Sequence, residues 1–120
     1  MTHLQLGMVG LGRMGANLVR RLMRGGHSCV VFDRDPAPGA ALAGEGAANA
    51  GSLAALVKAL APPRAVWVML PAGKATEQAI AELATLLEPG DAVIDGGNTF
   101  WKDDVRRAKE LAQRGLDYLD

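Results

Sequence analysis

Short apolar runs alternate along the chain with segments whose apolar positions recur every three or four residues. Runs that are apolar on both faces are typical of strands inside a parallel sheet, and the longer period indicates helices that connect them. This alternation predicts an α/β fold with a doubly wound, mostly parallel sheet. The predicted strands are residues 4–9, 28–33, 47–49, 65–70, 92–95 and 116–120.

Five helices are predicted between these strands, at residues 14–24, 36–43, 53–60, 76–87 and 102–114. Local signals mark several of their ends. Asp35 precedes a proline in the first turn of one helix, and Ser52 provides an N-cap for the next. Pro62 and Pro63 then end that helix, because proline lacks a backbone donor.

The apolar positions also predict which helix faces are buried. Met14 and Leu22 are expected on the buried face of the first helix. The last helix is expected to bury an apolar face that includes Val105 and to expose Arg107 in an ion pair with Asp103. Such an exposed pair contributes only about 0.2–0.5 kcal/mol.

The first predicted strand runs into Gly-x-Gly-x-x-Gly, the pattern that holds a dinucleotide pyrophosphate at the start of a helix. Gly10 permits a tight turn, Gly12 lets the backbone approach the phosphates, and Gly15 lets the helix lie close to the sheet. The free N–H groups at the helix N-terminus favour an anion. The candidate pyrophosphate site comprises Gly10, Leu11, Gly12, Arg13, Met14 and Gly15.

The second strand ends in Asp33, roughly 20 residues beyond the glycines, where a carboxylate accepts hydrogen bonds from the adenosine ribose. A 2′-phosphate would be repelled there, so Asp33 favours NAD. Arg34 leaves NADP possible, because a guanidinium can pair with that phosphate or stack on adenine. The alternative for Asp33 is a carboxylate that only caps the following turn.

Two further loops follow predicted strands and are candidates for cofactor contact. The loop 70–73, Leu-Pro-Ala-Gly, either lines the cofactor or is a plain strand-to-helix turn. The second, 95–98, is Asp-Gly-Gly-Asn, whose glycines admit close approach of a ligand. Asn98 is placed to contact a nicotinamide or a substrate hydroxyl, or to cap the last helix. We expect Asp95 to be buried and structural.

Composition narrows the class of protein. At 120 residues we expect one domain, residues 1–120. Thirteen Lys and Arg balance 13 Asp and Glu, so no overall field recruits nucleic acid or an anionic membrane. The single Cys29 is expected to be buried, and the absence of a leader or long apolar run indicates a cytoplasmic protein. No spacing suggests a metal site or a Ser-His-Asp arrangement.

With both glycine motifs placed, the chain resembles the amino-terminal domain of 6-phosphogluconate dehydrogenase over nearly all of its length. The resemblance rests on four stretches, of which Asp-Gly-Gly-Asn is the specific one. They are Gly10-Leu-Gly-Arg-Met-Gly-Ala-Asn17, Val66-Trp-Val-Met-Leu-Pro-Ala-Gly73, Ile94-Asp-Gly-Gly-Asn98 and Arg106-Arg-Ala108.

This resemblance implies roles for particular residues. The segment 10–15 would hold the pyrophosphate, Asp33, Arg34 and Asp35 would contact the adenosine ribose, and Leu70, Pro71 and Ala72 would line the cofactor. Asn98 would touch both cofactor and substrate. NADP-using members carry Asn-Arg-Thr in place of 33–35 and Lys in place of Pro71, so the chain looks like the shorter, NAD-preferring branch.

The implied reaction is hydride transfer from 6-phosphogluconate to the nicotinamide, followed by decarboxylation to ribulose 5-phosphate. The family's Ser-Gly-Gly substrate loop would lie soon after Asp120, and its catalytic Lys and Glu would follow in a helical substrate domain. We therefore expect this chain to bind the nucleotide without turning it over, and the full-length protein to be a homo-oligomer.

Two alternatives stay open from the sequence. Another β-hydroxyacid dehydrogenase, of the 3-hydroxyisobutyrate or glyoxylate type, shares the nucleotide fold but is expected to lack Asp-Gly-Gly-Asn followed by Arg-Arg. A non-catalytic NAD-binding sensor module shares only the glycine motif. Sequence beyond Asp120 would separate these three readings.

Overall fold

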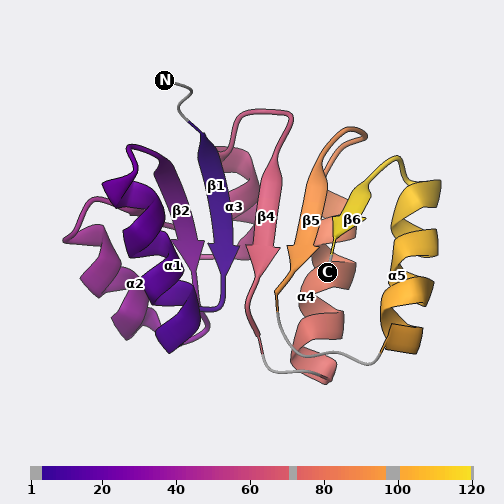
Figure 1. Ribbon diagram of the computed structural model, residues 1–120, viewed down its shortest axis with the longest axis horizontal. Helices are drawn as coiled ribbons and strands as arrows, with labels where there is room; N and C mark the ends of the chain where they lie inside the picture. The colour runs from indigo at the N-terminus through magenta and orange to yellow at the C-terminus, as the bar shows by residue number, and fades with distance from the viewer. Residues whose placement is uncertain (1–3, 71–72, 97–100, 120) are drawn as a thin grey trace.

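The computed structural model describes residues 4–70, 73–96 and 101–119. Within them, parallel strands form a 6-stranded sheet in the order β3-β2-β1-β4-β5-β6 (Figure 1). The strands are β1 (Gln5–Val9), β2 (Ser28–Phe32), β3 (Ala48–Asn49), β4 (Ala65–Val68), β5 (Ala92–Asp95) and β6 (Asp117–Leu119). The predicted doubly wound α/β fold is confirmed.

Helices cover both faces of the sheet (Figure 1). Along each strand, successive side chains point to opposite faces, so Met8 and Val31 join a core cluster beneath α1 and α2, whereas Val9 and Val30 join the cluster beneath α3, α4 and α5. The helices are α1 (Arg13–Arg24), α2 (Pro36–Ala43), α3 (Leu53–Ala59), α4 (Lys74–Leu86) and α5 (Trp101–Gln113).

The strand order reverses between β1 and β4. From β1 the chain adds β2 and β3 on one side, and it then crosses over to add β4, β5 and β6 on the other. In sheets of this kind, ligands bind in the crevice outside the carboxyl ends of the strands at this reversal. The described residues that directly follow β1, β2, β4 and β5 lie together at that edge.

Two predicted helix faces are right in part: Leu22 packs against the core and Leu111 is buried, but other residues of these faces are misplaced. The buried residues of α1 are Gly15, Ala16 and Val19, and Met14 is 71% exposed, because the close approach of the small residues turns Met14 out of the interface. On α5 the predicted exposed Arg107 is only 4% exposed, whereas Val105 is 52% exposed. The side chain of Asp103 is outside the described residues.

A buried carboxylate secures the opposite end of the sheet. Asp91 is 1% exposed and accepts hydrogen bonds from the N–H groups of Arg64 (2.6 Å) and Glu88 (2.8 Å) and from Arg64 Nη1 (3.1 Å). Burial acts to raise the pKa of Asp91, but these donors and the Arg64 charge outweigh it and lower the pKa.

Among the described helices, none is long and apolar enough to cross a membrane.

Candidate nucleotide-binding site

The connection from β1 into α1 requires glycine at two positions, one in the turn and one in the first part of the helix. Gly10 has a φ of +97°, and a Cβ there would lie 2.5 Å from the backbone oxygen of Met69. A Cβ on Gly15 would overlap the backbone oxygen of Gly10. The Gly10 N–H donates to the oxygen of Phe32 (2.9 Å), which ties the turn to the end of β2.

Gly12 differs from these two glycines: its backbone conformation is open to any residue, and the space beside it is empty. It is the N-cap of α1 with a φ of −65°, and no heavy atom lies within 4 Å of the position of a Cβ. No side chain caps the first turn of α1 within the described residues. The N–H groups of that turn therefore face open space beside Gly12, an arrangement that suits a phosphate group.

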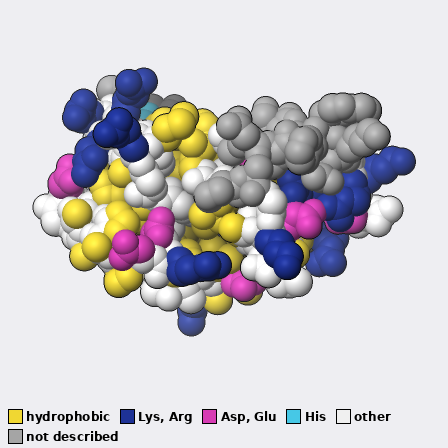
Figure 2. Space-filling model, turned by 90° about the horizontal axis from the view of Figure 1, so that it is seen from below, with side chains coloured by type: hydrophobic (Ala, Val, Ile, Leu, Met, Phe, Trp, Pro, Cys, Tyr) yellow, Lys and Arg dark blue, Asp and Glu magenta, His cyan; other side chains and the backbone are white. Residues whose placement is uncertain are grey.

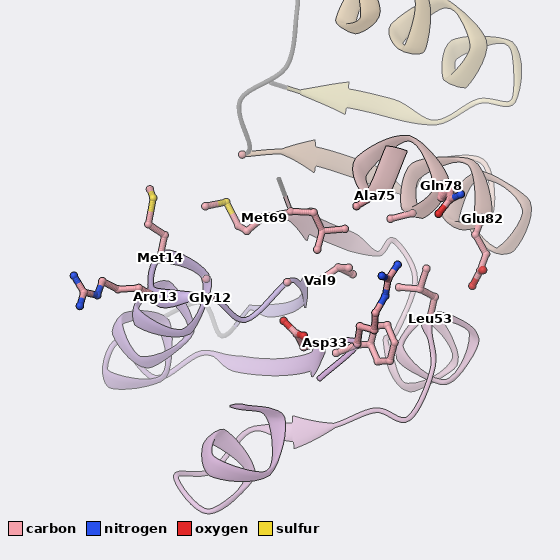
Figure 3. Close-up of a pocket in the computed structure, with 17 residues that line it drawn as sticks. Val9, Gly12, Arg13, Met14, Asp33, Leu53, Met69, Ala75, Gln78 and Glu82 are labelled. Carbon is pink, nitrogen blue, oxygen red and sulfur yellow. The ribbon is translucent and has the colours of Figure 1, made fainter. Parts of the chain in front are cut away.

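A cleft of about 860 Å³ opens beside this turn (Figure 3). Figure 2 views this edge of the sheet, and hydrophobic side chains gather in its centre with acidic and basic side chains around them. Gly12, Arg13 and Met14 lie at one end of the cleft, and Leu53, Gln78 and Glu82 lie at the other (Figure 3). Its volume is within the range of small-molecule and cofactor sites, and the uncapped turn at Gly12 favours an anion at one end of it.

Asp33 joins the two loops at the cleft. Its Oδ2 accepts a hydrogen bond from the N–H of Leu11 (2.6 Å), and its Oδ1 accepts one from the N–H of Asp35 (2.8 Å). The turn-capping role considered for Asp33 is therefore present, and the same half-buried residue also lines the cleft. Both hydrogen bonds fix the carboxylate beside the glycine turn.

Most of the predicted site residues meet in this one cleft. Leu11 and Asp35 do not line it: the Leu11 side chain is buried in the core, and the Asp35 carboxylate caps α2 by accepting from the N–H of Ala37 (3.1 Å). Pro71, Ala72 and Asn98 lie outside the described residues. The predicted residues that line the cleft are Gly10, Gly12, Arg13, Met14, Gly15, Asp33, Arg34 and Leu70.

Sequence reasoning missed the wall that α3 and α4 provide. Ala75, Gln78, Ala79 and Glu82 line the cleft from one face of α4. Their helical spacing, directly after the loop 70–73, was a signal that could have found them. Leu53 had no such signal, because it comes from α3 and reaches the cleft only through the fold.

A charge cluster joins α5 to β5 and α4; in it Arg107 and Asp95 are buried, whereas the Glu77 side chain is 45% exposed. Arg107 Nη1 lies 3.5 Å from Asp95 Oδ2, and Arg107 Nη2 lies 3.4 Å from Glu77 Oε1. Tyr118 Oη donates to the same Asp95 oxygen (3.0 Å). Burial acts to lower the pKa of Arg107, but Tyr118, Asp95 and Glu77 outweigh it and raise the pKa. Asp95, 2% exposed, is buried as expected.

Comparison with known proteins identifies the family of the chain. A family model described as the NAD binding domain of 6-phosphogluconate dehydrogenase matches residues 5–120. The chain belongs to this family. Its sheet order, glycine turn and acidic residue at the end of β2 are those of a dinucleotide-binding domain. The resemblance drawn from the sequence motifs is confirmed.

Curated relatives carry the same name. A 6-phosphogluconate dehydrogenase of Haloferax volcanii, named NAD(+)-dependent and decarboxylating, is 41% identical over 114 residues, which cover 95% of this chain and 38% of the relative. A decarboxylating 6-phosphogluconate dehydrogenase of Chlamydia pneumoniae is 39% identical over 119 residues, which cover 95% of this chain and 25% of that protein. The chain thus spans about a quarter to two-fifths of these relatives.

Solved structures agree on the fold. The 6-phosphogluconate dehydrogenase of Plasmodium falciparum matches with a TM-score of 0.89 at 26% identity, over 97% of this chain and 26% of that one. The 3-hydroxyisobutyrate dehydrogenase of Mycobacterium tuberculosis matches with a TM-score of 0.82 at 25% identity, over 98% of this chain and 39% of its own. This NAD-binding domain is therefore shared with related dehydrogenases.

Proposed function

We propose that residues 1–120 form one domain that binds NAD in the cleft beside the glycine turn. The open space at Gly12, against the uncapped first turn of α1, is the observation that carries this proposal. The pyrophosphate fits there because Gly12 has no Cβ; a Cβ would occupy the space that the phosphates need. In this proposal, Gly10, Arg13, Met14 and Gly15 complete the cradle, and Leu11 contributes through its backbone.

The adenosine half is assigned to the β2 side of the cleft. Asp33 faces the ribose, and Arg34 lines the cleft beside it, with Asp35 holding the start of α2. The nicotinamide half then extends toward β4 and β5. The roles proposed for Leu70, Pro71, Ala72 and Asn98, the last toward both cofactor and substrate, follow from their family motifs.

We propose further that NAD is preferred over NADP. The carboxylate of Asp33 is held in place by two N–H groups, so it cannot turn aside from a 2′-phosphate without losing both hydrogen bonds. The name of the Haloferax volcanii relative, NAD(+)-dependent, supports the same preference. Arg34 is the residue that would favour NADP if Asp33 did not oppose it.

A calorimetric titration of the chain with NAD and with NADP, in identical salt, tests both proposals. We expect tighter binding of NAD by the native chain. Asp33→Asn should shift the ratio of the two affinities toward NADP by about tenfold, since it removes one charge repulsion, while its amide oxygen still accepts one of the two N–H bonds that hold the carboxylate. Glu110→Asn on α5, away from this cleft, is the matched control and should leave the ratio unchanged. Binding of neither nucleotide would contradict the proposed site, and an unchanged ratio in Asp33→Asn would remove Asp33 from the selection.

The activity of the longer protein is proposed from the family. Bound NAD would accept a hydride from 6-phosphogluconate, and decarboxylation would give ribulose 5-phosphate in a cytoplasmic homo-oligomer that needs neither nucleic acid nor a membrane. By the family resemblance, the Lys and Glu that perform the proton transfers lie beyond residue 120. We therefore expect no NADH from this chain with NAD and 6-phosphogluconate, and measured turnover by the chain alone would refute that division of roles.

A further inference from the structure

Arg107 is a buried cation for which the proposed NAD site has no role. It is 4% exposed and lies between the carboxylates of Asp95 and Glu77, which come from β5 and α4. A buried guanidinium is costly unless several acceptors surround it, and its planar fork can reach two carboxylates at once. Arg107 thus connects α4, α5 and the end of β5.

The end of β5 is also a wall of the cleft. Gly96 follows Asp95 directly and lines the cleft together with Met69. The Gly96 N–H donates to the oxygen of Val68 (3.0 Å), and a Cβ on Gly96 would overlap Trp67 Nε1 and Met69 Sδ. Because Gly96 is tied to Val68 and has no free space beside it, a shift of Asp95 displaces the wall at Gly96.

We propose that Arg107 is a positioning residue for the nicotinamide half of the dinucleotide. It holds Asp95, and through Asp95 it sets the position of Gly96 at the nicotinamide end of the cleft. This inference rests on the proposed NAD site, in which Asp33 places the adenosine half on the β2 side and the nicotinamide half therefore lies toward β4 and β5.

The neighbouring arginine offers a matched control. Arg106 also pairs with Glu77, and with Glu110 (3.7 Å), but its side chain is 51% exposed, against 5% for Arg107. Exposed pairs contribute little, whereas removal of one partner from a buried pair leaves an uncompensated charge. Substitution of Arg106 therefore removes the same positive charge from the same helix and should leave the position of the end of β5 unchanged.

The test compares NAD with ADP-ribose, which has the adenosine and pyrophosphate groups but no nicotinamide. Calorimetry on the 120-residue chain should show that Arg107→Met weakens NAD binding by about tenfold and changes ADP-ribose binding less than about twofold. Arg107→Lys, which keeps the charge without the fork, should recover part of the NAD affinity. Arg106→Met should bind both ligands as the native chain does.

The other outcomes distinguish failure of the proposed NAD site from failure of the positioning role of Arg107. Failure of the native chain to bind either ligand overturns the proposed NAD site. If the native chain binds both and Arg107→Lys, a variant that keeps the buried charge and hence the fold, weakens both equally or neither, the positioning role is wrong. An equal loss of NAD affinity in Arg106→Met would also overturn it, because the effect would then be one of charge on α5.

Discussion

Two glycines of one motif are required for different physical reasons. Gly10 has a positive φ and stands against the backbone of Met69, so a side chain there strains the fold itself. Gly12 has an ordinary φ and open space around its missing Cβ, so a side chain there would meet only the proposed ligand. The motif predicts a turn at Gly10 and an approach of the phosphates at Gly12, and the structure gives the positive φ that the first needs and the open space that the second needs.

This difference predicts opposite results for two valine substitutions. Gly12→Val should keep its thermal midpoint within about 4 °C of the native value, because the change meets no neighbouring atom, and should lose NAD binding. Gly10→Val should unfold the domain or lower its midpoint severely, because both φ and the contact with Met69 are violated. Circular dichroism melts and calorimetry measure the two effects, and retained NAD binding in Gly12→Val would place the pyrophosphate elsewhere.

At the scale of elements, the sequence predicted the order and type of every helix and strand. It was wrong where a charged side chain is buried by ion pairs with distant residues. The apolar runs predict β1, β2, β4 and β5 well, because strands buried on both faces leave a clear pattern. On α5, polarity predicted an exposed Arg107, whereas two distant carboxylates make its burial possible. No local pattern contains that information, since the partners come from β5 and α4.

The same limit applies to the cleft. Its glycine turn and Asp33 are local signals with known spacing, and both were found from the sequence. The wall at Leu53 is set by the packing of α3 beside α4, which only the assembled sheet determines. Met14, predicted in both the core and the cleft, is exposed and lines the cleft, because Gly15 and Ala16 take the place against the sheet.

The turn between α4 and β5 gives a prediction about acid stability. Asp91 has a folded pKa below its unfolded value of about 4, so its contribution to stability is present above that pH and is lost as the pH falls through the folded pKa. Asp91→Asn should cost about 2–4 kcal/mol at pH 7, because Arg64 loses its buried partner. The difference from the native chain should shrink below about pH 4.

Urea unfolding at pH 7 and at pH 3 measures this effect. Asp117→Asn, at an exposed position on β6, serves as the control and should show neither the loss at pH 7 nor the change with pH. A constant difference between Asp91→Asn and the native chain at both pH values would mean that Asp91 is not ionised as the Arg64 geometry requires.

At the scale of the whole molecule, the cleft joins two halves of the sheet that the chain builds separately. The first half contains β1, β2 and β3 with α1 and α2, and the second contains β4, β5 and β6. The cleft takes residues from both, with Asp33 on one side of the order reversal and Gly96 on the other. A dinucleotide that spans the cleft should therefore stabilise both halves, and a mononucleotide should stabilise one.

Hydrogen exchange resolves the two halves. NAD should slow exchange at the turn of Gly10 and also at the ends of β4 and β5, because each half of the ligand holds one half of the sheet. AMP, at a concentration that gives equal occupancy, should slow exchange around Asp33 and leave the end of β5 at the rate of the free protein. Protection by NAD confined to the first half would contradict the placement of the nicotinamide beside Gly96, and with it the role of Arg107. Protection of both halves by AMP would instead mean that ligand binding tightens the sheet as a unit, so that the reversal between β1 and β4 would not divide its stability.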